Sequence, residues 1–404
     1  MIGAEDRMTK GDAMRKLAKT GLIKCVSKSI LLAALACTLP ALADDWTYDS
    51  TAGTITDSVW TFTATVVSGN KMTVKTCTGC PSELSTLDFS KPVKDANETV
   101  YTIVALGDNV TSKAGRSLFG ETTNYWKDNS MVNGGTLAEL ILPSAGLKTI
   151  NTGAFCKCTA LTNIVNFLPD SVTYVGSAAF QEVHAKCDLY ANGVAGTIGR
   201  LCFKGSYIKS VHFGKGLKTL GNDSNGQGSF EGCNYLTNIV FHPEGSGITI
   251  QKSALSMGST ITLKSDLALY GVKTINSGAF SRINLGGHSV VFDKGLQSGI
   301  TASVNGLSNF NKVHFLGAPP AGQTGTFADY GQSASTKITT YVPYKYRQQW
   351  WQYADGYDPE MSDAEKESLI QLTGTTFSST YATTPSKRPL LLADKPSGLM
   401  FFVR

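Results

Sequence analysis

The residue types that could carry redox or metal chemistry in this sequence are cysteine and histidine. Cys77-Thr-Gly-Cys80 has the C-x-x-C spacing of a redox dithiol or of half a zinc site. A redox dithiol needs a helix that begins there, whereas the flanking residues alternate like strands, and a zinc ribbon needs a second C-x-x-C that the sequence lacks. We therefore interpret Cys77 and Cys80 as a candidate disulfide that closes a turn, or as two unreactive thiols.

The five histidines do not cluster at the spacing of a metal site. His212 and His314 both stand in the word Val-His-Phe, where the period of two of a strand directs the histidine outward. The sequence contains no G-x-S-x-G, H-E-x-x-H or P-loop motif, and Gly226–Gly232 resembles a phosphate loop only superficially. We expect no catalytic residues, no metal site and no cofactor, and hence a protein that is not an enzyme.

The first 43 residues have the composition of an export signal. A basic segment precedes a short apolar run, Ile30–Leu39, and the small-residue motif Ala41-Leu42-Ala43 follows. This motif predicts cleavage between Ala43 and Asp44, and a secreted, extracellular or cell-surface protein. The run is too short to span a bilayer, and no other segment is a candidate, so we expect no transmembrane anchor.

The charge of the remaining chain argues against nucleic-acid binding. Residues 1–43 contain seven of the 36 Lys and Arg and three of the 31 Asp and Glu, which leaves 29 basic and 28 acidic residues in the remainder. A nearly neutral body lacks the basic surface that nucleic-acid binding requires.

An aromatic or apolar residue preceded by a small residue recurs at a nearly fixed period. We call this residue the aromatic mark. From Phe155 onward the spacings are 25, 23, 27, 25, 25, 24 and 23 residues. The marks are Phe119, Phe155, Phe180, Phe203, Phe230, Leu255, Phe280, Val304 and Phe327. The longer interval after Phe119 indicates an insertion at 121–135. A fixed period of this length is typical of a coil in which each unit buries its apolar face against the next.

A second pattern, apolar-x-x-apolar-x-apolar, keeps step with the aromatic mark and predicts one strand per turn. Its clear copies are Leu84/Leu87/Phe89, Leu137/Leu140/Leu142, Ile208/Val211/Phe213, Leu236/Ile239/Phe241 and Phe310/Val313/Phe315. Degenerate copies end at Phe167, Leu189, Leu263 and Phe292. Cys158 and Cys233 share one phase, three residues after the mark, and are expected to be small buried residues.

The best copies, Leu147–Phe167, Leu217–Phe241 and Val272–Phe292, resemble the leucine-rich repeats of BspA-type bacterial surface proteins. The resemblance covers about residues 84–343. It implies a curved solenoid at the cell surface that serves adhesion or protein binding, and it implies no catalytic residues.

The predicted fold is mainly β, a leucine-rich-repeat-like solenoid of about ten turns. We divide the chain into a signal peptide (1–43), a β-rich N-terminal cap (44–83), the solenoid (84–343) and a C-terminal capping helix with a tail hairpin (344–404). In the tail, Tyr346, Trp350 and Trp351 are expected to cover the last turn, and Ser362 with Glu365 predicts a capping box. Pro389–Ala393 and Leu399–Val403 are the expected hairpin strands.

Outward strand positions form a ladder across the turns, which is how repeat coils bind extended partners. The candidate ligand-binding residues of this ladder are Lys209, His212, Asn238, Asn311, Lys312 and His314. The sequence thus favours binding of a protein or glycan on a host, a neighbouring cell or a matrix. The alternative is a structural envelope or extracellular-matrix component without a specific ligand.

The first prediction concerns processing. We expect the mature protein to begin at Asp44, since the small-residue motif ends at Ala43. Intact-mass measurement and N-terminal sequencing of the exported protein check this. A diacylglyceryl mass on Cys37 would instead make the chain a lipoprotein.

Overall fold

The computed structural model describes most of the chain after its first 44 residues. The described residues are 45–108, 116–121, 134–221, 227–297, 304, 306–320, 338–351, 358–368, 371–372 and 390–393. They all belong to one compact unit, Asp45–Arg404. The predicted signal peptide and its cleavage site at Ala43 and Asp44 lie outside the described residues.

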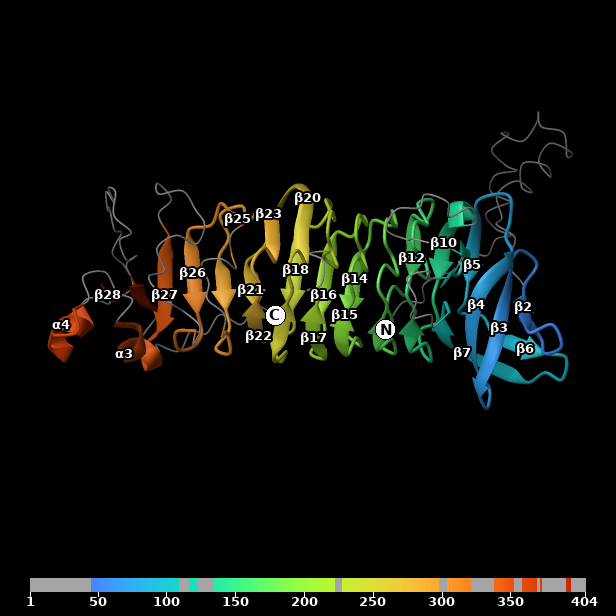
Figure 1. Ribbon diagram of the computed structural model, residues 1–404, viewed down its shortest axis with the longest axis horizontal. Coiled ribbons are helices and arrows are strands. Elements are labelled where there is room, and N and C mark those ends of the chain that lie inside the picture. The colour runs from blue at the N-terminus through green and yellow to red at the C-terminus, as the bar shows by residue number, and fades with distance from the viewer. Residues whose placement is uncertain are drawn as a thin grey trace, which may run out of the picture. The chain divides into compact units, whose positions relative to one another are not determined.

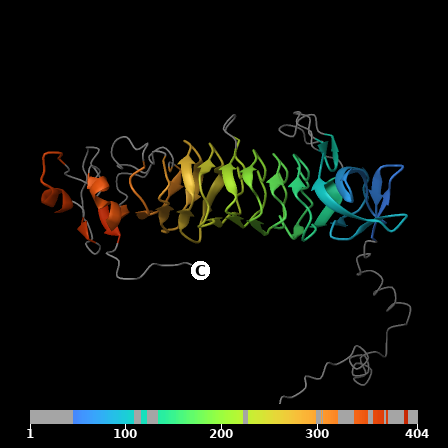
Figure 2. The same cartoon turned by 90° about the horizontal axis from the view of Figure 1, so that it is seen from below.

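Two ladders of parallel strands form the repeat region, and the chain contributes strands to them alternately (Figures 1 and 2). The first ladder pairs β7 (Val100–Leu106), β11 (Thr149–Ile150), β13 (Tyr174–Val175), β15 (Gly196–Ile198), β17 (Leu217–Leu220), β19 (Ile248–Ile250) and β22 (Val272–Ile275), in this order. Because the chain returns to the same ladder in the same direction after each turn, it forms a coil.

The second ladder consists of three hydrogen-bonded groups of parallel strands. They are β5 (Ser85–Asp88), β10 (Leu137–Ile141) and β12 (Asn163–Val165); β14 (Asp188–Ala191), β16 (Ser210–Phe213) and β18 (Asn238–Phe241); and β21 (Leu267–Leu269), β24 (Val290–Phe292), β26 (Lys312–Phe315) and β27 (Thr339–Pro343). The last strand of the second group contacts the first strand of the third. The mainly β class is therefore as predicted, and the second ladder has ten strands in the described residues.

The bends that carry the aromatic mark hold successive turns in one phase. The amide of each mark donates to the carbonyl that precedes the next mark, as in Phe155 N to Ala179 O (2.8 Å) and Phe180 N to Cys202 O (2.8 Å). The same bond follows from Phe203, Phe230 and Leu255. Further along, these bends widen into a third set of parallel strands, β20 (Leu255–Thr262), β23 (Phe280–Asn284) and β25 (Leu307–Ser308).

Left-handed backbone on either side of the mark produces these bends. The residues two positions before it with positive φ are Gly153, Ala178, Leu201, Ser253 and Gly278, and those two positions after it are Lys157, Glu182, Gly205, Gly232 and Arg282. For a residue other than glycine this conformation costs about 1–2 kcal/mol. The turn therefore tolerates local strain in order to direct the mark into the interior.

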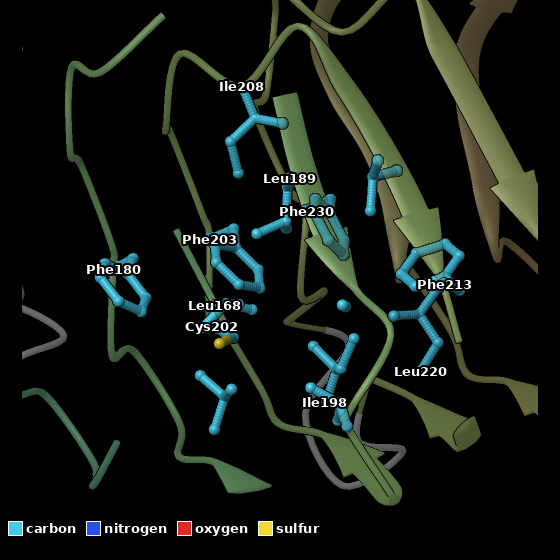
Figure 3. Close-up of a cluster of buried hydrophobic side chains, with 14 of the residues drawn as sticks. Leu168, Phe180, Leu189, Ile198, Cys202, Phe203, Ile208, Phe213, Leu220 and Phe230 are labelled. Atoms are coloured by element: carbon cyan, nitrogen blue, oxygen red, sulfur yellow. The ribbon is translucent and has the colours of Figure 1, made fainter. Parts of the chain in front are cut away.

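The core is a row of stacked rings from successive turns. The ring centroids of Phe155 and Phe180 lie 5.2 Å apart, those of Phe180 and Phe203 lie 5.7 Å apart, and those of Phe203 and Phe230 lie 5.0 Å apart, all nearly parallel. Figure 3 shows Phe180, Phe203 and Phe230 with the aliphatic side chains that fill the space around them. All described aromatic marks are buried, including Phe119, Leu255 and Val304. Phe327 lies outside the described residues.

The clear copies of the second pattern are buried as predicted, apart from Leu84, which is 68% exposed. Leu84 precedes β5, the edge strand of its group, so no earlier strand of that group covers it. Three of the four degenerate copies were placed in the wrong register. Leu189 pairs with Val211, so Ala191 takes the last inward position, and Leu269 rather than Leu263 pairs with Phe292.

The third misassigned copy, which ends at Phe167, is displaced by an insertion. Where one turn runs Ile141-Leu142-Pro143, the next runs Val165-Asn166-Phe167-Leu168-Pro169, so two residues separate the strand from its inward leucine. Leu168 is buried, whereas Phe167 is only partly buried. Of the degenerate copies, only the one that ends at Phe292 has the predicted register, with Phe292 beside Phe315.

The N-terminal segment is an antiparallel meander that continues into the first ladder. The meander comprises β1 (Trp46–Asp49), β2 (Thr54–Thr56), β3 (Thr61–Ser68) and β4 (Lys71–Gly79). β6 (Val93–Asp95) pairs in parallel with β1 and antiparallel with β7. β3 and β4 form an antiparallel hairpin, and β4 pairs in parallel with β7. Trp46, Trp60 and Phe62 fill its interior. Where the cap ends and the solenoid begins remains a prediction.

Short elements lie at the predicted insertion. β8 (Arg116–Ser117) and β9 (Gly120–Glu121) form an antiparallel pair, and the 3-10 turn η1 (Gly134–Thr136) leads into β10. Residues 122–133 of the predicted insertion lie outside the described residues.

Short helical elements cover the last turn. β27 ends at Pro343, and η2 (Tyr344–Tyr346) and the short α3 (Arg347–Trp350) follow. Trp350 is buried against Phe315, with ring centroids 4.7 Å apart, and its Nε1 donates to Gly317 O. Trp351 is partly buried against the core.

The remaining tail elements are α4 (Asp363–Ser368), β28 (Gln371–Leu372) and β29 (Leu390–Ala393). The predicted capping box is present, since Ser362 N donates to Glu365 Oε2 and Glu365 N donates to Ser362 Oγ. β29 pairs in parallel with β27 and β28, which extends the second ladder. The other predicted hairpin strand, Leu399–Val403, lies outside the described residues.

The ring stack predicts where truncation is costly. We expect Phe203→Ala to lower the free energy of unfolding by about 3–5 kcal/mol, because the ring is buried between two others. Lys209→Ala, at an exposed position just before β16, is expected to cost less than about 0.5 kcal/mol. Urea denaturation of both variants measures the difference. Equal shifts of the two midpoints would show that the assigned phase is wrong.

Candidate binding face

On nine of the ten strands of the second ladder, one outward position holds an uncharged, mostly apolar residue, and we call these nine residues the apolar column. On the tenth strand, β5, Asp88 pairs with Ile141. Ladder registers place Ile141 beside Val165, Tyr190 beside His212 and Val240, and Ala268 beside Val291, His314 and Tyr341. The apolar column is Ile141, Val165, Tyr190, His212, Val240, Ala268, Val291, His314 and Tyr341. Val165 and Tyr190 remain 38% and 48% exposed.

Rings of the apolar column stack on each other along the ladder. The centroids of Tyr190 and His212 lie 4.5 Å apart at an interplanar angle of 18°, and those of His314 and Tyr341 lie 4.4 Å apart at 5°. The spacing between paired strands matches the thickness of stacked rings, so each ring restricts its neighbour. The face is thus preorganised and loses little side-chain entropy on contact.

The outward positions of the first ladder have a different chemistry. Registers align Thr149 with Tyr174, and Thr197 with Thr219, Thr249 and Thr274. We call these six residues the threonine column. Their hydroxyl groups can remain hydrogen-bonded to water, so this face gains little from being covered. Covering the apolar column with a partner would therefore contribute more binding free energy than covering the threonine column.

A second aromatic stack lies beside the apolar column, at the bends that precede β14, β16 and β18. The rings of His184 and Tyr207 have centroids 4.2 Å apart, and those of Tyr207 and Tyr235 lie 4.4 Å apart. The ammonium group of Lys186 lies 5.0 Å from the Tyr235 centroid, within the range of a cation–π contact.

Polar groups separate this stack from the apolar column. Asp188, Ser210 and Asn238 are in register on three neighbouring strands. Ser210 Oγ donates to Asp188 Oδ1 (2.7 Å), and Ser265 Oγ donates to Asn238 Oδ1 (2.6 Å). The face therefore offers hydrogen-bonding groups between two aromatic surfaces.

The sequence-predicted ligand-binding residues fall into two separate groups on this ladder. Lys209 precedes β16, His212 lies on it, and Asn238 lies on the next strand. Asn311, Lys312 and His314 lie on or next to β26, in another hydrogen-bonded group. Lys209, Asn311 and Lys312 are exposed, whereas both histidines are partly buried in their ring stacks.

Sequence reasoning missed the tyrosines of this face. Tyr190 and Tyr341 occupy the outward positions beside His212 and His314, and Tyr207 and Tyr235 lie four and five residues after an aromatic mark. The available signal was the recurrence of an aromatic residue at one phase of consecutive turns.

A hollow of about 410 Å³ opens where the second ladder is interrupted. No strand pairing joins β12 and β14 in the described residues, and the extra residues Asn166 and Phe167 follow directly after β12. Phe167 contacts the edges of the core rings Phe180 and Phe203. The hollow is lined by Ser144, Ile164, Asn166, Phe167, Pro169, Asp170, Asp188 and Tyr190.

The cysteines provide no reactive thiol at this face. Cys77 and Cys80 are joined by a disulfide. Burial raises the pKa of Cys156 and of Cys233 to about 12 and that of Cys187 to about 11. Cys158 and Cys233 are buried, as predicted, and Cys187 is partly buried just before β14. These thiols remain protonated at neutral pH.

The part of the chain that the structure describes contains neither a metal-ligand cluster nor a membrane-spanning helix. It contains no group of three or more His, Cys, Asp or Glu residues placed to hold a metal ion. Its helices are all too short or too polar to cross a bilayer.

Comparison with known proteins identifies the repeat. Residues 124–224 and 193–298 match the family model "BspA type Leucine rich repeat region" in six copies. The chain therefore carries a BspA-type leucine-rich repeat region. No curated protein matches the chain.

Solved structures with similar folds superpose loosely. A leucine-rich repeat protein from Bacteroides ovatus is 15% identical over 70% of this chain and 71% of that protein, with a TM-score of 0.40. A leucine-rich cell surface protein from Faecalibacterium prausnitzii is 14% identical over 72% and 88%, with a TM-score of 0.37. The pneumococcal vaccine antigen PcpA is 13% identical over 75% and 96%, with a TM-score of 0.27.

The partial burial of His314 predicts a pH dependence. Desolvation lowers the pKa of His314 below its ordinary 6.5; nearby Asp266 opposes this shift and Lys312 reinforces it. The unfolded chain therefore binds this proton more readily than the folded one, and the free energy of unfolding falls as the pH drops from 6.5 towards the folded pKa.

We expect an NMR titration of His314 in the folded protein to show a midpoint below 6.5. His314→Gln should reduce the loss of stability between pH 7 and pH 5, as measured by thermal denaturation across that range. A folded-state midpoint at or above 6.5 would contradict the assigned burial.

Proposed function

We propose that the chain is an exported binding protein that holds a protein or glycan partner across the apolar column of the second ladder. The observation that carries this proposal is the contrast between the two faces of the same coil. One presents threonine at five of seven aligned outward positions, with Ala105 and Tyr174 at the other two. The other presents nine uncharged residues, of which Tyr190, His212, His314 and Tyr341 carry rings.

Desolvation explains why this contrast favours binding. A charged side chain at the centre of an interface loses water at a high cost, whereas an apolar or weakly polar side chain gains from contact. Exposed apolar surface framed by polar groups is typical of interaction sites. The adjacent polar residues Asp188, Ser210 and Asn238 supply directional contacts, so the face suits an extended partner that crosses several turns.

Binding without catalysis agrees with the chemistry of the described residues. Their buried thiols have raised pKa values, and the histidines of the apolar column are engaged in ring stacks. The side chains of this face are arranged to be covered by a partner rather than to transfer a proton.

Two features support a secreted or surface-exposed location. The predicted signal segment at residues 1–43 is one. The Cys77–Cys80 disulfide is the other, because disulfides persist mainly in oxidising compartments. A host, a neighbouring cell or a matrix would then be the source of the partner.

The proposal is tested with labelled chain on protein and glycan arrays, followed by affinity measurements on each hit. We expect His212→Glu with Val291→Glu to weaken binding at least about tenfold, because the added charges must be desolvated. Both residues are partly exposed members of the apolar column, so melting temperatures should change little. His314 is a poorer choice, since it is more deeply packed against Tyr341.

Tyr174→Glu is the matched control. Tyr174 is 46% exposed, close to the exposure of Tyr190, but it lies on the first ladder. We expect its affinity to change by less than about twofold. Equal effects of the two variants would refute the assignment of the face, and self-assembly of the chain without any array hit would favour a structural component.

A further inference from the structure

The hollow between β12 and β14 has an unusual balance of charge. Its lining includes the carboxylates of Asp170 and Asp188 and the rings of Phe167 and Tyr190, together with an amide and a hydroxyl group. Lysine, arginine and histidine are all missing from its described lining. A ligand group that enters it therefore meets two negative charges and aromatic surface.

Neutral donors alone hold the two carboxylates. Asp188 Oδ1 accepts from Ser210 Oγ (2.7 Å), and Asp170 Oδ1 accepts from Asn192 Nδ2 (3.3 Å). Within the described residues, neither carboxylate lies at ion-pair distance from a basic side chain. The hydrogen bonds fix the position of each group and leave its charge uncompensated.

Tyr190 supplies a fixed aromatic surface beside these charges. His212 covers the Tyr190 ring from the β16 side, with centroids 4.5 Å apart. The hollow lies on the opposite side, towards Ile164 of β12 and the inserted Phe167. The ring face that the stack leaves uncovered is thus directed towards the hollow.

We propose that this hollow anchors an arginine side chain of a protein partner; this rests on the proposed function of the apolar column, with which it shares Tyr190. A planar guanidinium group stacks on an aromatic face and donates several hydrogen bonds to carboxylates at once. Hydrogen bonds between two charged groups are about twice as strong as those between neutral groups. This charge complementarity selects a basic peptide over a neutral or anionic glycan at this position.

The geometry also ranks the basic residues. A lysine ammonium group would meet the same charges, but it is a compact, strongly hydrated group that cannot stack as a plane. The order of affinity is therefore arginine, then lysine, with a neutral residue weakest.

The test uses a random peptide library displayed on phage and selected on the purified chain. Selected peptides should contain arginine. Replacement of that arginine by citrulline, a neutral residue of nearly the same shape, should lower affinity about tenfold or more in fluorescence anisotropy. The variant Asp170→Asn with Asp188→Asn should cause a loss of affinity of similar size. If the arginine contacts these carboxylates, the citrulline peptide should bind this variant little more weakly than it binds the unchanged chain.

Glu98→Gln with Glu244→Gln serves as the matched charge control. Both residues are exposed, and the two substitutions remove two negative charges that do not line the hollow. This control should leave the affinity of the arginine peptide within about twofold. Thermal melts establish that all variants remain folded.

Several results would overturn the anchor. Selected peptides without basic residues, equal binding of arginine and citrulline peptides, or displacement of the peptide by a neutral oligosaccharide would each do so. Binding that is lost in His212→Glu with Val291→Glu but unchanged in Asp170→Asn with Asp188→Asn would refute the anchor alone. Failure of every peptide to bind would also refute it, and the proposed function would then depend on the array experiment.

Discussion

The row of hydrogen bonds from each aromatic mark to the turn that follows is the constraint on which the rest of the structure depends. These bonds fix the phase of successive turns, so that the marks of neighbouring turns meet in the core. A single turn could not bury its own ring, because its partner atoms belong to the turns before and after it. Residues such as Ala178 and Glu182, which flank Phe180, adopt left-handed backbone for the same reason. Their local strain is offset by the burial of the mark between them.

Once the inward positions are fixed, the outward positions are free to differ between the ladders. Strand alternation assigns Val211 to the core and His212 to the surface, whatever the surface is used for. The chain places threonine on one ladder and apolar or aromatic side chains on the other. The insertion of Asn166 and Phe167 lies at one of the two gaps between the hydrogen-bonded groups of the second ladder. A repeated unit thus acquires one unrepeated feature, and it lies beside Tyr190 on the apolar column.

The fold was largely predictable because its signal is repeated, whereas the site depends on exceptions to the repeat. Phe155, Phe203 and Phe280 share one phase, and their burial followed from that phase alone. Leu189 and Leu263 were misassigned, by two and by six positions, because alternating apolar residues fit more than one register and only the neighbouring strand distinguishes them. The outward direction of His212 and His314 was predicted correctly. Their ring stacks were not, because Tyr190 and Tyr341 come from other turns.

Stacking of parallel strands also determines how the molecule would respond to force. The hydrogen bonds between turns lie in series along the coil, so a pull between β5 and β27 loads every row equally and the rows can break one at a time. A released turn of 23–27 residues lengthens by about 75–90 Å when fully extended. The coil would therefore lengthen in discrete steps under tension while the remaining turns kept their geometry. Each step would limit the force that is transmitted to an attached partner.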